Sequence, residues 1–379
     1  MSRSKRAKLG REEEGRQLLL PGLPDHLAHL CLSQVPARVL FSVCHSWRRL
    51  LYSPSFPPFL SVYALLSSSS AGSASAVSDE DRDENDTHLG FSSYDPISGA
   101  WRPLPPPPPD PPLRVVLVRH PSFIARRLPI QSVALSGHLL LLAATTHQLL
   151  PALPRPLVFS PASNQWRLGP SLTTRRRWCA AGAAAGCVYV ASGMGAEYNM
   201  EVARCAERWD LRKPQWEEVA RLKDSKFSRE AVEAVGCRGR LCMVNVKGNA
   251  AKDGAIYNVE QNAWEEMPRG MLAGWKGPAA SMDEDAIYVV DEAMGTLKEY
   301  KWEMDEWKTV MESERFKGAS QMTAGGGRVC AVLAGGVGIA VVDVLARPPN
   351  MWVVEPPSGM LVMTVHVLPR MSRPDTEDI

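Results

Sequence analysis

An aromatic residue followed seven positions later by Trp recurs along this chain, and this repeat limits the possible folds more than any other feature. The pairs with this offset are Tyr94 and Trp101, Phe159 and Trp166, Trp209 and Trp216, Tyr257 and Trp264, and Tyr300 and Trp307. Turn-forming residues separate the two aromatics in four of the pairs, which is typical of two strands joined by a tight turn. A sixth, looser copy ends at Trp352, so the repeat accounts for most of the 11 Trp residues.

A turn residue ahead of an apolar run forms a second signature, which precedes the first in each repeat. The turn positions are Gly137, Gly186, Gly239, Asp285 and Gly327. Together the two signatures predict four antiparallel strands in roughly 45 to 50 residues. A single sheet of this size cannot bury both faces, whereas sheets arranged in a ring cover one another. The repeat therefore predicts a mainly β chain that folds as a β-propeller.

Incomplete repeats at the two sides of the array predict how the ring closes. The run 59–66 and the hairpin that ends at Trp101 lack a first strand. The run 361–368 follows the last Trp and has no partner strands of its own. Joining the two runs gives six complete blades, so we expect the C-terminal strand to pair with the N-terminal one.

Residues 20–58 have a helical pattern that differs from everything after them. Asp25 suits the start of a first helix, and Pro36 suits the start of a second. Apolar residues then recur at steps of three and four from Val39 to Leu51, which predicts one helix with a continuous apolar stripe. A unit of about 40 residues is too small to bury this stripe alone, so the pattern indicates a partner.

These patterns divide the chain into a helical unit, a propeller and two tails. The predicted boundaries are 1–19 for a disordered basic and acidic tail, 20–58 for the helical unit, 59–370 for the propeller and 371–379 for the second tail. A flexible acidic loop at 67–88 and a Pro-rich loop at 105–112 are predicted within the propeller. No signal-peptide core follows the N-terminal residues, and no run approaches the ~18 apolar residues of a membrane span. We therefore expect a location in the cytoplasm, the nucleus or both.

Composition and motifs argue against several classes of function. Lys and Arg total 43 against 41 Asp and Glu, so the net charge of +2 indicates neither a nucleic-acid nor a membrane partner. The 8 Cys residues include no C-x-x-C pair and the His residues are dispersed, so no metal site is expected. Because no nucleophile elbow, phosphate-binding loop or paired-carboxylate motif is present, we expect no catalytic residue and no cofactor.

Two parts of the chain resemble known families. The stretches 20–27, 31–32, 35–38 and 43–51 resemble an F-box, with its Leu-Pro start and its Val-Cys-x-Ser-Trp-Arg segment. The repeats resemble kelch motifs, whose Gly doublet is partly kept at Ser192-Gly193 and at Gly335-Gly336. Other repeats lack the doublet, so the kelch copies are degenerate. Over nearly its whole length, the chain resembles plant F-box/kelch-repeat proteins.

The resemblance implies a non-catalytic substrate receptor of an SCF-type cullin ubiquitin ligase. In that family the F-box docks on a Skp-type adaptor, and through it on a cullin, while the propeller holds the target protein that is ubiquitinated. Carried over residue by residue, the adaptor-binding positions are Leu23, Pro24, Leu27, Leu32, Val35, Val39, Val43, Cys44, Trp47 and Leu50. About half of these side chains are expected to form the core of the helical unit instead.

A second interpretation is a kelch-propeller enzyme, for example an oxidase, or a small-molecule-binding protein with an incidental helical appendage. An enzyme has no use for helices that dock on an adaptor. The resemblance to an F-box therefore favours the receptor.

Equivalent positions in successive repeats indicate a recognition face on the propeller. Ten residues before the turn positions stand Arg127, Arg176, Arg229, Trp275 and Lys317. Such positions fall on one ring at the start of the inner strands, and the residues next to them are Arg177, Trp178 and Lys276. The whole set is predicted to form an exposed face for the target protein, suited to an acidic peptide or a planar anionic group. In the competing interpretation, these loops are polar only because they are exposed.

Overall fold

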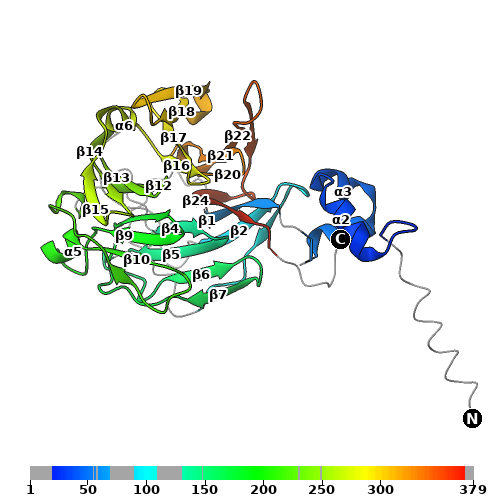
Figure 1. The fold of residues 1–379 in the computed structure, drawn as a ribbon, viewed down its shortest axis with the longest axis horizontal. Coiled ribbons are helices and arrows are strands. Elements are labelled where there is room, and N and C mark those ends of the chain that lie inside the picture. Colours follow the sequence, from blue (N-terminus) through cyan, green and yellow to red (C-terminus); the bar gives the residue numbers. More distant parts are fainter. Residues whose placement is uncertain are drawn as a thin grey trace, which may run out of the picture.

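Strands make up most of the regular structure after residue 59, as the repeat predicts (Figure 1). The structure is a computed structural model that describes residues 19–53, 55–56, 59–68, 89–108, 130–146, 148–228, 231–247 and 250–371. Within these residues, six sheets of four antiparallel strands form a ring. A small helical unit is followed along the chain by a six-bladed propeller, which confirms the predicted fold class.

The blades are numbered I to VI, and the strands of each blade are given from the innermost to the outermost. Blade I contains β24 (Met360–Pro369), β1 (Leu60–Ser68), β2 (Leu89–Asp95) and β3 (Ala100–Pro103). Blade II contains β4 (Ile130–Leu135), β5 (His138–Ala144), β6 (Leu157–Ser160) and β7 (Gln165–Leu168). Blade III contains β8 (Ala180–Ala184), β9 (Cys187–Ala191), β10 (Ala206–Trp209) and β11 (Glu217–Glu218).

The second half of the ring continues the same order. Blade IV contains β12 (Ala231–Cys237), β13 (Arg240–Lys247), β14 (Ala250–Asn258) and β15 (Ala263–Glu266). Blade V contains β16 (Ala279–Met282), β17 (Ala286–Asp291), β18 (Thr296–Lys301) and β19 (Glu306–Glu312). Blade VI contains β20 (Gln321–Gly325), β21 (Arg328–Val332), β22 (Ile339–Asp343) and β23 (Asn350–Val354). The helices are α2 (Asp25–Ser33), α3 (Ala37–Val43), α4 (His45–Tyr52), α5 (Met200–Arg204) and α6 (Arg269–Gly274), with short 3-10 turns η3 (Lys226–Ser228), η4 (Glu314–Phe316) and η5 (Ala334–Gly336).

The position of a strand within its blade decides how much of it is buried. The second strands β5, β9, β17 and β21 are buried almost along their whole length, because neighbouring blades cover both of their faces. The outermost strands β7 and β19 are mostly exposed. Separate apolar clusters fill the interfaces between successive blades all round the ring. Each blade therefore depends on its two neighbours for a core.

The Trp of the repeat joins its blade to the preceding one. Its ring packs against the aromatic residue seven positions earlier, with centroids 5.1 Å apart for Phe159 and Trp166. Its indole Nε1 donates to a backbone carbonyl that follows the outermost strand of the preceding blade. These bonds join Trp101 to Glu355 at 2.7 Å, Trp166 to Pro105 at 2.8 Å, Trp216 to Pro170 at 3.0 Å, Trp264 to Ala220 at 2.6 Å, and Trp307 to Met271 at 3.0 Å. A Phe would keep the packing and lose the bond, which explains the choice of Trp.

Strand β24 closes the ring as predicted. It pairs antiparallel with β1, and Pro369 lies opposite Leu60. Blade I therefore takes its innermost strand from the C-terminal part of the chain and its other strands from the N-terminal part. An apolar cluster that includes Val341 and Val365 joins this composite blade to blade VI.

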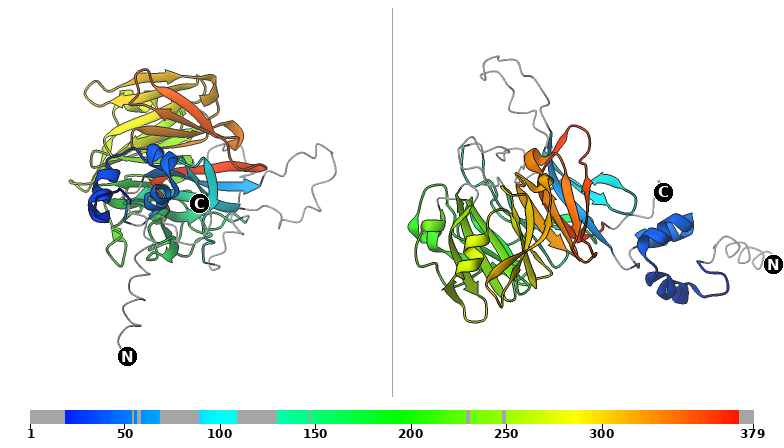
Figure 2. Two further views of the ribbon diagram at one scale, coloured as in Figure 1. Left: turned by 90° about the vertical axis from the view of Figure 1, so that its right-hand side faces the viewer. Right: turned by 90° about the horizontal axis from the view of Figure 1, so that it is seen from above.

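A small cluster of polar and aromatic side chains fixes the helical unit to blade I. Tyr52 at the end of α4 donates its hydroxyl proton to the carboxylate of Asp95, the last residue of β2. Burial, followed by this carboxylate, raises the pKa of Tyr52 and keeps the hydroxyl protonated. Arg370, directly after β24, donates to the carbonyl oxygens of Tyr52 at 3.2 Å and Ser53 at 2.7 Å. The helices thus lie beside blade I, at the end of the propeller where the inner strands finish (Figure 2).

The helical unit differs from the sequence prediction at one point. The apolar pattern predicts one helix from Val39 to Leu51, but two helices are present, α3 and α4. Cys44 separates them because its backbone is extended, with φ −158° and ψ 167°. Val39 and Val43 on α3 stay exposed, whereas Leu51 on α4 is buried. The prediction of one continuous apolar stripe is therefore wrong.

Several predicted segments lie outside the described residues. They are nearly all of the 1–19 tail, most of the 67–88 loop, the second half of the 105–112 loop and nearly all of the 371–379 tail. In the described residues, the N-terminal helices fall within 20–58 and the propeller strands within 59–370.

Deleting residues 359–379 should destabilise the whole propeller. Blade I would lose its innermost strand, and blade VI would lose the apolar cover that this strand provides. We expect thermal unfolding, followed by circular dichroism, to become broader and to begin at least about 5 °C lower. A chain shortened only by 372–379 keeps β24 and serves as the control. Equal melting curves for the two shortened chains would contradict the closure.

Replacing Trp264 with Phe should cost more stability than the same change at Trp352. Trp264 donates to Ala220 at 2.6 Å, so its loss leaves that carbonyl without its partner. Trp352 is 40% exposed, and no acceptor for its indole nitrogen is found in the described part of the chain. We expect a loss of about 1 kcal/mol in unfolding free energy for Trp264→Phe and less than about 0.5 kcal/mol for Trp352→Phe. Urea denaturation measures both, and equal losses would show that the bond between blades contributes nothing.

Candidate binding surfaces

The helical unit leaves an apolar patch on α2 and α3 uncovered. Leu27 is 41% exposed, and Val39 and Val43 are 49% and 51% exposed. Pro24, just before α2, is exposed as well. Leu30 is 65% exposed and is missing from the sequence prediction, although its position three residues after Leu27 on a helix could have identified it. These five residues are called the helical patch below.

The remaining predicted adaptor-binding residues are buried or half-buried within the helical unit itself. Leu32 and Leu50 are buried in its core, and Val35 and Trp47 pack against that core. The indole of Trp47 also donates to a backbone carbonyl of the segment before α2, at 2.8 Å. The half-buried positions are Leu23 and Cys44. The sequence pattern identified the apolar positions of the unit but not which of them face outward.

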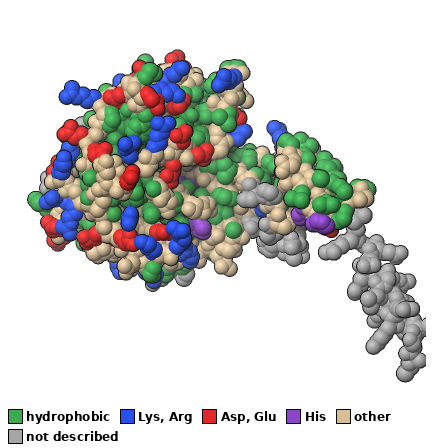
Figure 3. All heavy atoms as spheres, in the orientation of Figure 1, with side chains coloured by type: hydrophobic (Ala, Val, Ile, Leu, Met, Phe, Trp, Pro, Cys, Tyr) green, Lys and Arg blue, Asp and Glu red, His purple; other side chains and the backbone are tan. Residues whose placement is uncertain are grey.

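The helical patch has the character of a protein-binding surface. Hydrophobic side chains cover much of the visible face of the helical unit, with few charged side chains among them (Figure 3). The core of the unit is already formed by other residues, such as Leu32, Leu40 and Leu51. An exposed apolar patch beside a complete core is typical of an interaction site.

The predicted exposed face on the propeller is wrong at Arg176 and Trp275 of the ring, and also at Arg177 and Trp178 beside it. Arg176 is only 2% exposed and Trp275 is completely buried. The indole of Trp275 donates to Glu233 at 3.2 Å, and its ring packs edge-on against Trp307. The residues before the inner strands thus turn into the propeller core, which repeat spacing alone does not reveal.

The lysines of the predicted ring are exposed. Lys276 stands on the surface after α6, and Lys317 forms an ion pair with Glu314 at 2.7 Å. An exposed pair of this kind contributes little to stability, so Lys317 keeps its ability to meet a partner. The two other predicted cations, Arg127 and Arg229, lie outside the described residues.

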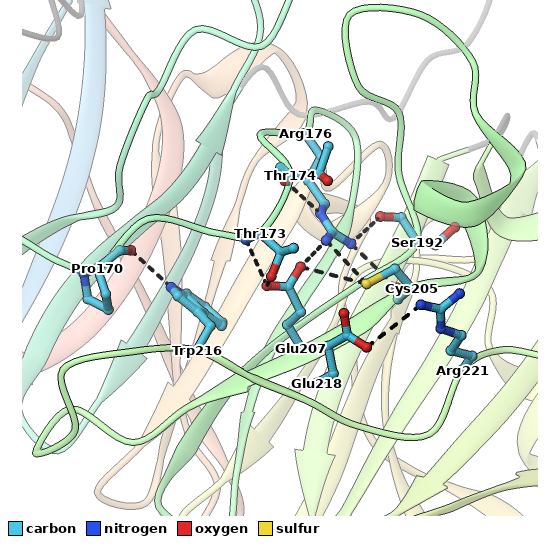
Figure 4. A network of polar contacts seen from close by, with 10 residues as sticks. All are labelled: Pro170, Thr173, Thr174, Arg176, Ser192, Cys205, Glu207, Trp216, Glu218 and Arg221. Carbon is cyan, nitrogen blue, oxygen red and sulfur yellow. Dashed lines mark hydrogen bonds and ion pairs between the residues drawn. The ribbon is translucent and has the colours of Figure 1, made fainter.

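Arg176 is instead the centre of a buried polar network in blade III (Figure 4). Its Nη2 forms an ion pair with Glu207 of β10, and its Nη1 donates to the carbonyls of Ser192 at 3.3 Å and Cys205 at 3.4 Å. Glu207 also accepts from the backbone N–H of Thr173 at 3.0 Å and from its hydroxyl at 2.9 Å. The network therefore holds the loop before β8 against the middle strands of its blade.

The same loop continues to the mouth of the central channel. The channel has a volume of about 540 Å³ and is lined mainly by the inner strands β4, β8, β12, β16, β20 and β24. Trp178 lines it, and the guanidinium of Arg177 lies over the Trp178 ring, 3.9 Å from the ring centroid. Arg177 and Trp178 are only 6% and 7% exposed, so they are far less open than the predicted ring requires.

Among the residues that the structure describes, no helix is long and apolar enough to cross a membrane. No group of three or more His, Cys, Asp or Glu side chains in this part of the chain is placed to hold a metal ion.

Comparison with known proteins reveals the family. No protein-family model matches the chain. The chain is 46% identical over 369 residues to the F-box/kelch-repeat protein SKIP25 of Arabidopsis thaliana, and the alignment covers 94% of this chain and 91% of that protein. This chain belongs to the F-box/kelch-repeat family. More distant relatives from the same plant are the F-box/kelch-repeat protein At2g44130, 25% identical over 304 residues with 68% and 69% coverage, and the F-box protein AFR, 24% identical over 304 residues with 74% and 71% coverage.

Membership of this family confirms the resemblance found in the sequence. The helices α2 to α4 form the F-box, and the six sheets form the kelch propeller. The helical patch and the ends of the propeller are therefore the candidate binding surfaces of this chain.

Removing one partner of the buried ion pair should destabilise blade III strongly. Arg176→Met leaves the Glu207 carboxylate buried without its counter-charge, because both side chains are fully buried. We expect a loss of about 3 to 5 kcal/mol in unfolding free energy, measured by urea denaturation. The double variant Arg176→Met/Glu207→Met removes both charges and should recover part of the loss. A double variant that is no more stable than the single one would contradict this account.

Proposed function

We propose that this F-box/kelch-repeat protein is a non-catalytic substrate receptor of an SCF-type ubiquitin ligase. Its F-box docks on a Skp-type adaptor, and through the adaptor on a cullin. Its propeller binds the target protein that is to be ubiquitinated. The observation that carries the proposal is the helical patch, which stays exposed although the core of the F-box is complete without it.

The helical patch supports adaptor docking because its side chains are aliphatic and lie on two adjacent helices. Leu27 and Leu30 stand one turn apart on α2, and Val39 and Val43 stand one turn apart on α3. Each aliphatic side chain that a partner covers contributes roughly 1.5 to 3 kcal/mol to binding before the costs of association. The patch is thus large enough to anchor a helical or loop partner.

The end of the propeller away from the F-box supports target binding. The loops between the second and third strands of blades II, III, V and VI lie at that end, because the second strands run toward it from the turns at the F-box end. These loops carry large exposed side chains, namely Leu150, Tyr198, Met200, Met294 and Val337. Exposed apolar and aromatic side chains on rigidly held loops suit protein recognition.

Changing two residues of the helical patch to Lys should abolish adaptor binding without unfolding the F-box. Leu30 and Val43 are 65% and 51% exposed and stand near the C-terminal ends of α2 and α3, where Lys is well tolerated. We expect the Leu30→Lys/Val43→Lys variant to bind a purified Skp-type adaptor at least about tenfold more weakly, measured by calorimetry. Its melting temperature should stay close to that of the natural protein.

Met304→Lys is the matched control for this experiment. Met304 is 61% exposed and lies in the turn between β18 and β19 of blade V, outside the helical patch, so the variant should bind the adaptor normally. Equal affinity of the patch variant and the control would contradict docking through the helical patch. If the unchanged protein fails to bind a Skp-type adaptor, the receptor function itself is wrong.

A further inference from the structure

Two consecutive arginines in blade III are both buried, yet within the described part of the chain only Arg176 forms an ion pair. Arg176 is neutralised by Glu207 and also donates to backbone carbonyls. Arg177 is 6% exposed, and in the described residues neither its Nε nor its Nη1 has a hydrogen-bond partner. Burial lowers the pKa of the Arg177 guanidinium, which reflects the missing compensation. The same loop thus contains one satisfied and one unsatisfied buried cation.

A buried guanidinium without hydrogen-bond partners destabilises the folded protein, so its presence needs an explanation. The unpaired donors give up their bonds to water and gain none in return. The contact of Arg177 with the Trp178 ring compensates only in part, because an aromatic face attracts a cation but accepts no full hydrogen bond. A chain that places Glu207 beside Arg176 is able to supply carboxylates to this blade. The missing partner of Arg177 is therefore expected to come from another molecule.

The surrounding backbone holds Arg177 and Trp178 in place. Arg177 exchanges two backbone hydrogen bonds with Met194, at 2.8 and 3.0 Å. Gly193 permits this approach, since a Cβ at that position would lie 2.8 Å from the carbonyl oxygen of Arg177. Trp178 has φ 53°, a left-handed conformation that a bulky residue rarely adopts. Strain of this kind persists where neighbouring structure enforces it, and it is often found at binding sites.

The position of Arg177 suits contact with a target. It precedes β8, so it lies at the end of the propeller where the inner strands begin, opposite the F-box. Trp178 beside it lines the mouth of the central channel. Arg175 in the same loop is exposed and adds a second positive charge. Glu233 of the neighbouring blade also lines the channel, but its carboxylate accepts the indole N–H of Trp275 and forms no ion pair with Arg177 within the described residues.

We propose that Arg177, supported by Trp178, binds an oxyanion of the target protein, either a carboxylate or a phosphate on an acidic segment. This assignment rests on the proposed function, because it takes the target to bind at this end of the propeller. In the described residues, the Nε and Nη1 donors have no hydrogen-bond partner, so a turn of the guanidinium from the Trp178 ring toward an arriving oxyanion breaks no hydrogen bond of these two donors. Arginine suits both carboxylate and phosphate, since its donors form a planar fork.

Peptide libraries with one fixed central residue test the proposal without the adaptor or the cullin. Three libraries carry Glu, phosphoserine or Gln at that position, and the immobilised full-length protein selects from each. We expect the unchanged protein to retain the Glu or the phosphoserine library at least about tenfold more strongly than the Gln library. The library that is favoured distinguishes a carboxylate from a phosphate. Arg177→Met should lose this preference, and Arg177→Lys should retain only part of it.

The melting temperature of Arg177→Met and the binding of a variant at Arg175 distinguish a binding role of Arg177 from a structural one. Arg177→Met should melt no lower than the unchanged protein, because it removes a buried charge that has no partner. Arg175→Gln removes one exposed charge from the same loop and should keep most of the preference for the acidic library. Equal retention of all three libraries by the unchanged protein, or an undiminished preference in Arg177→Met, would overturn the proposal. Adaptor binding is measured separately, so either result leaves the receptor function open to its own test.

Discussion

The pairing of β24 with β1 is the constraint on which the rest of the structure depends. Each blade buries its faces only against its neighbours, so an open array would leave two apolar faces in water. Closure removes both faces at once by placing the last strand of the chain inside the first blade. The Trp bonds between successive blades act at the rim, and the inner strands pack on one another around the channel. Closure at the centre and bonding at the rim together make the ring a rigid support for its loops.

The fold could be predicted from the sequence because every blade needs the same contacts, so the residues that make them recur at the same spacing. A Trp that must both pack on an aromatic ring and donate to the preceding blade recurs at a fixed offset, as Phe159 and Trp166 show. The incomplete repeats at the two ends then imply closure without further information. The F-box resemblance likewise depends on short local segments, which this chain contains in the expected order.

The details of the binding surfaces could not be predicted in the same way, because they depend on single backbone angles and on contacts between distant residues. The helical period continues through Cys44, but an extended backbone there breaks the helix and separates Val43 from Leu51. The repeat register places Arg176 on a ring, but it carries no information about Glu207, which lies 31 residues later and draws Arg176 into the blade. The difference between Arg176 and its neighbour Arg177 is visible only when all partners of both side chains are known.

The same C-terminal segment that closes the propeller also holds the F-box. Arg370 follows β24 directly, and its guanidinium donates to the carbonyls at the end of α4 while lying near the ring of Tyr52. Tyr52 in turn donates to Asp95, whose carboxylate also accepts the backbone N–H of Ile97 at 2.8 Å and so shapes the β2–β3 turn. These contacts bridge α4, blade I and the closing strand, so they hold the F-box against the closed ring. The orientation of the helical patch thus depends in part on the segment that closes the propeller, so we expect opening of the ring to loosen the hold on the F-box as well.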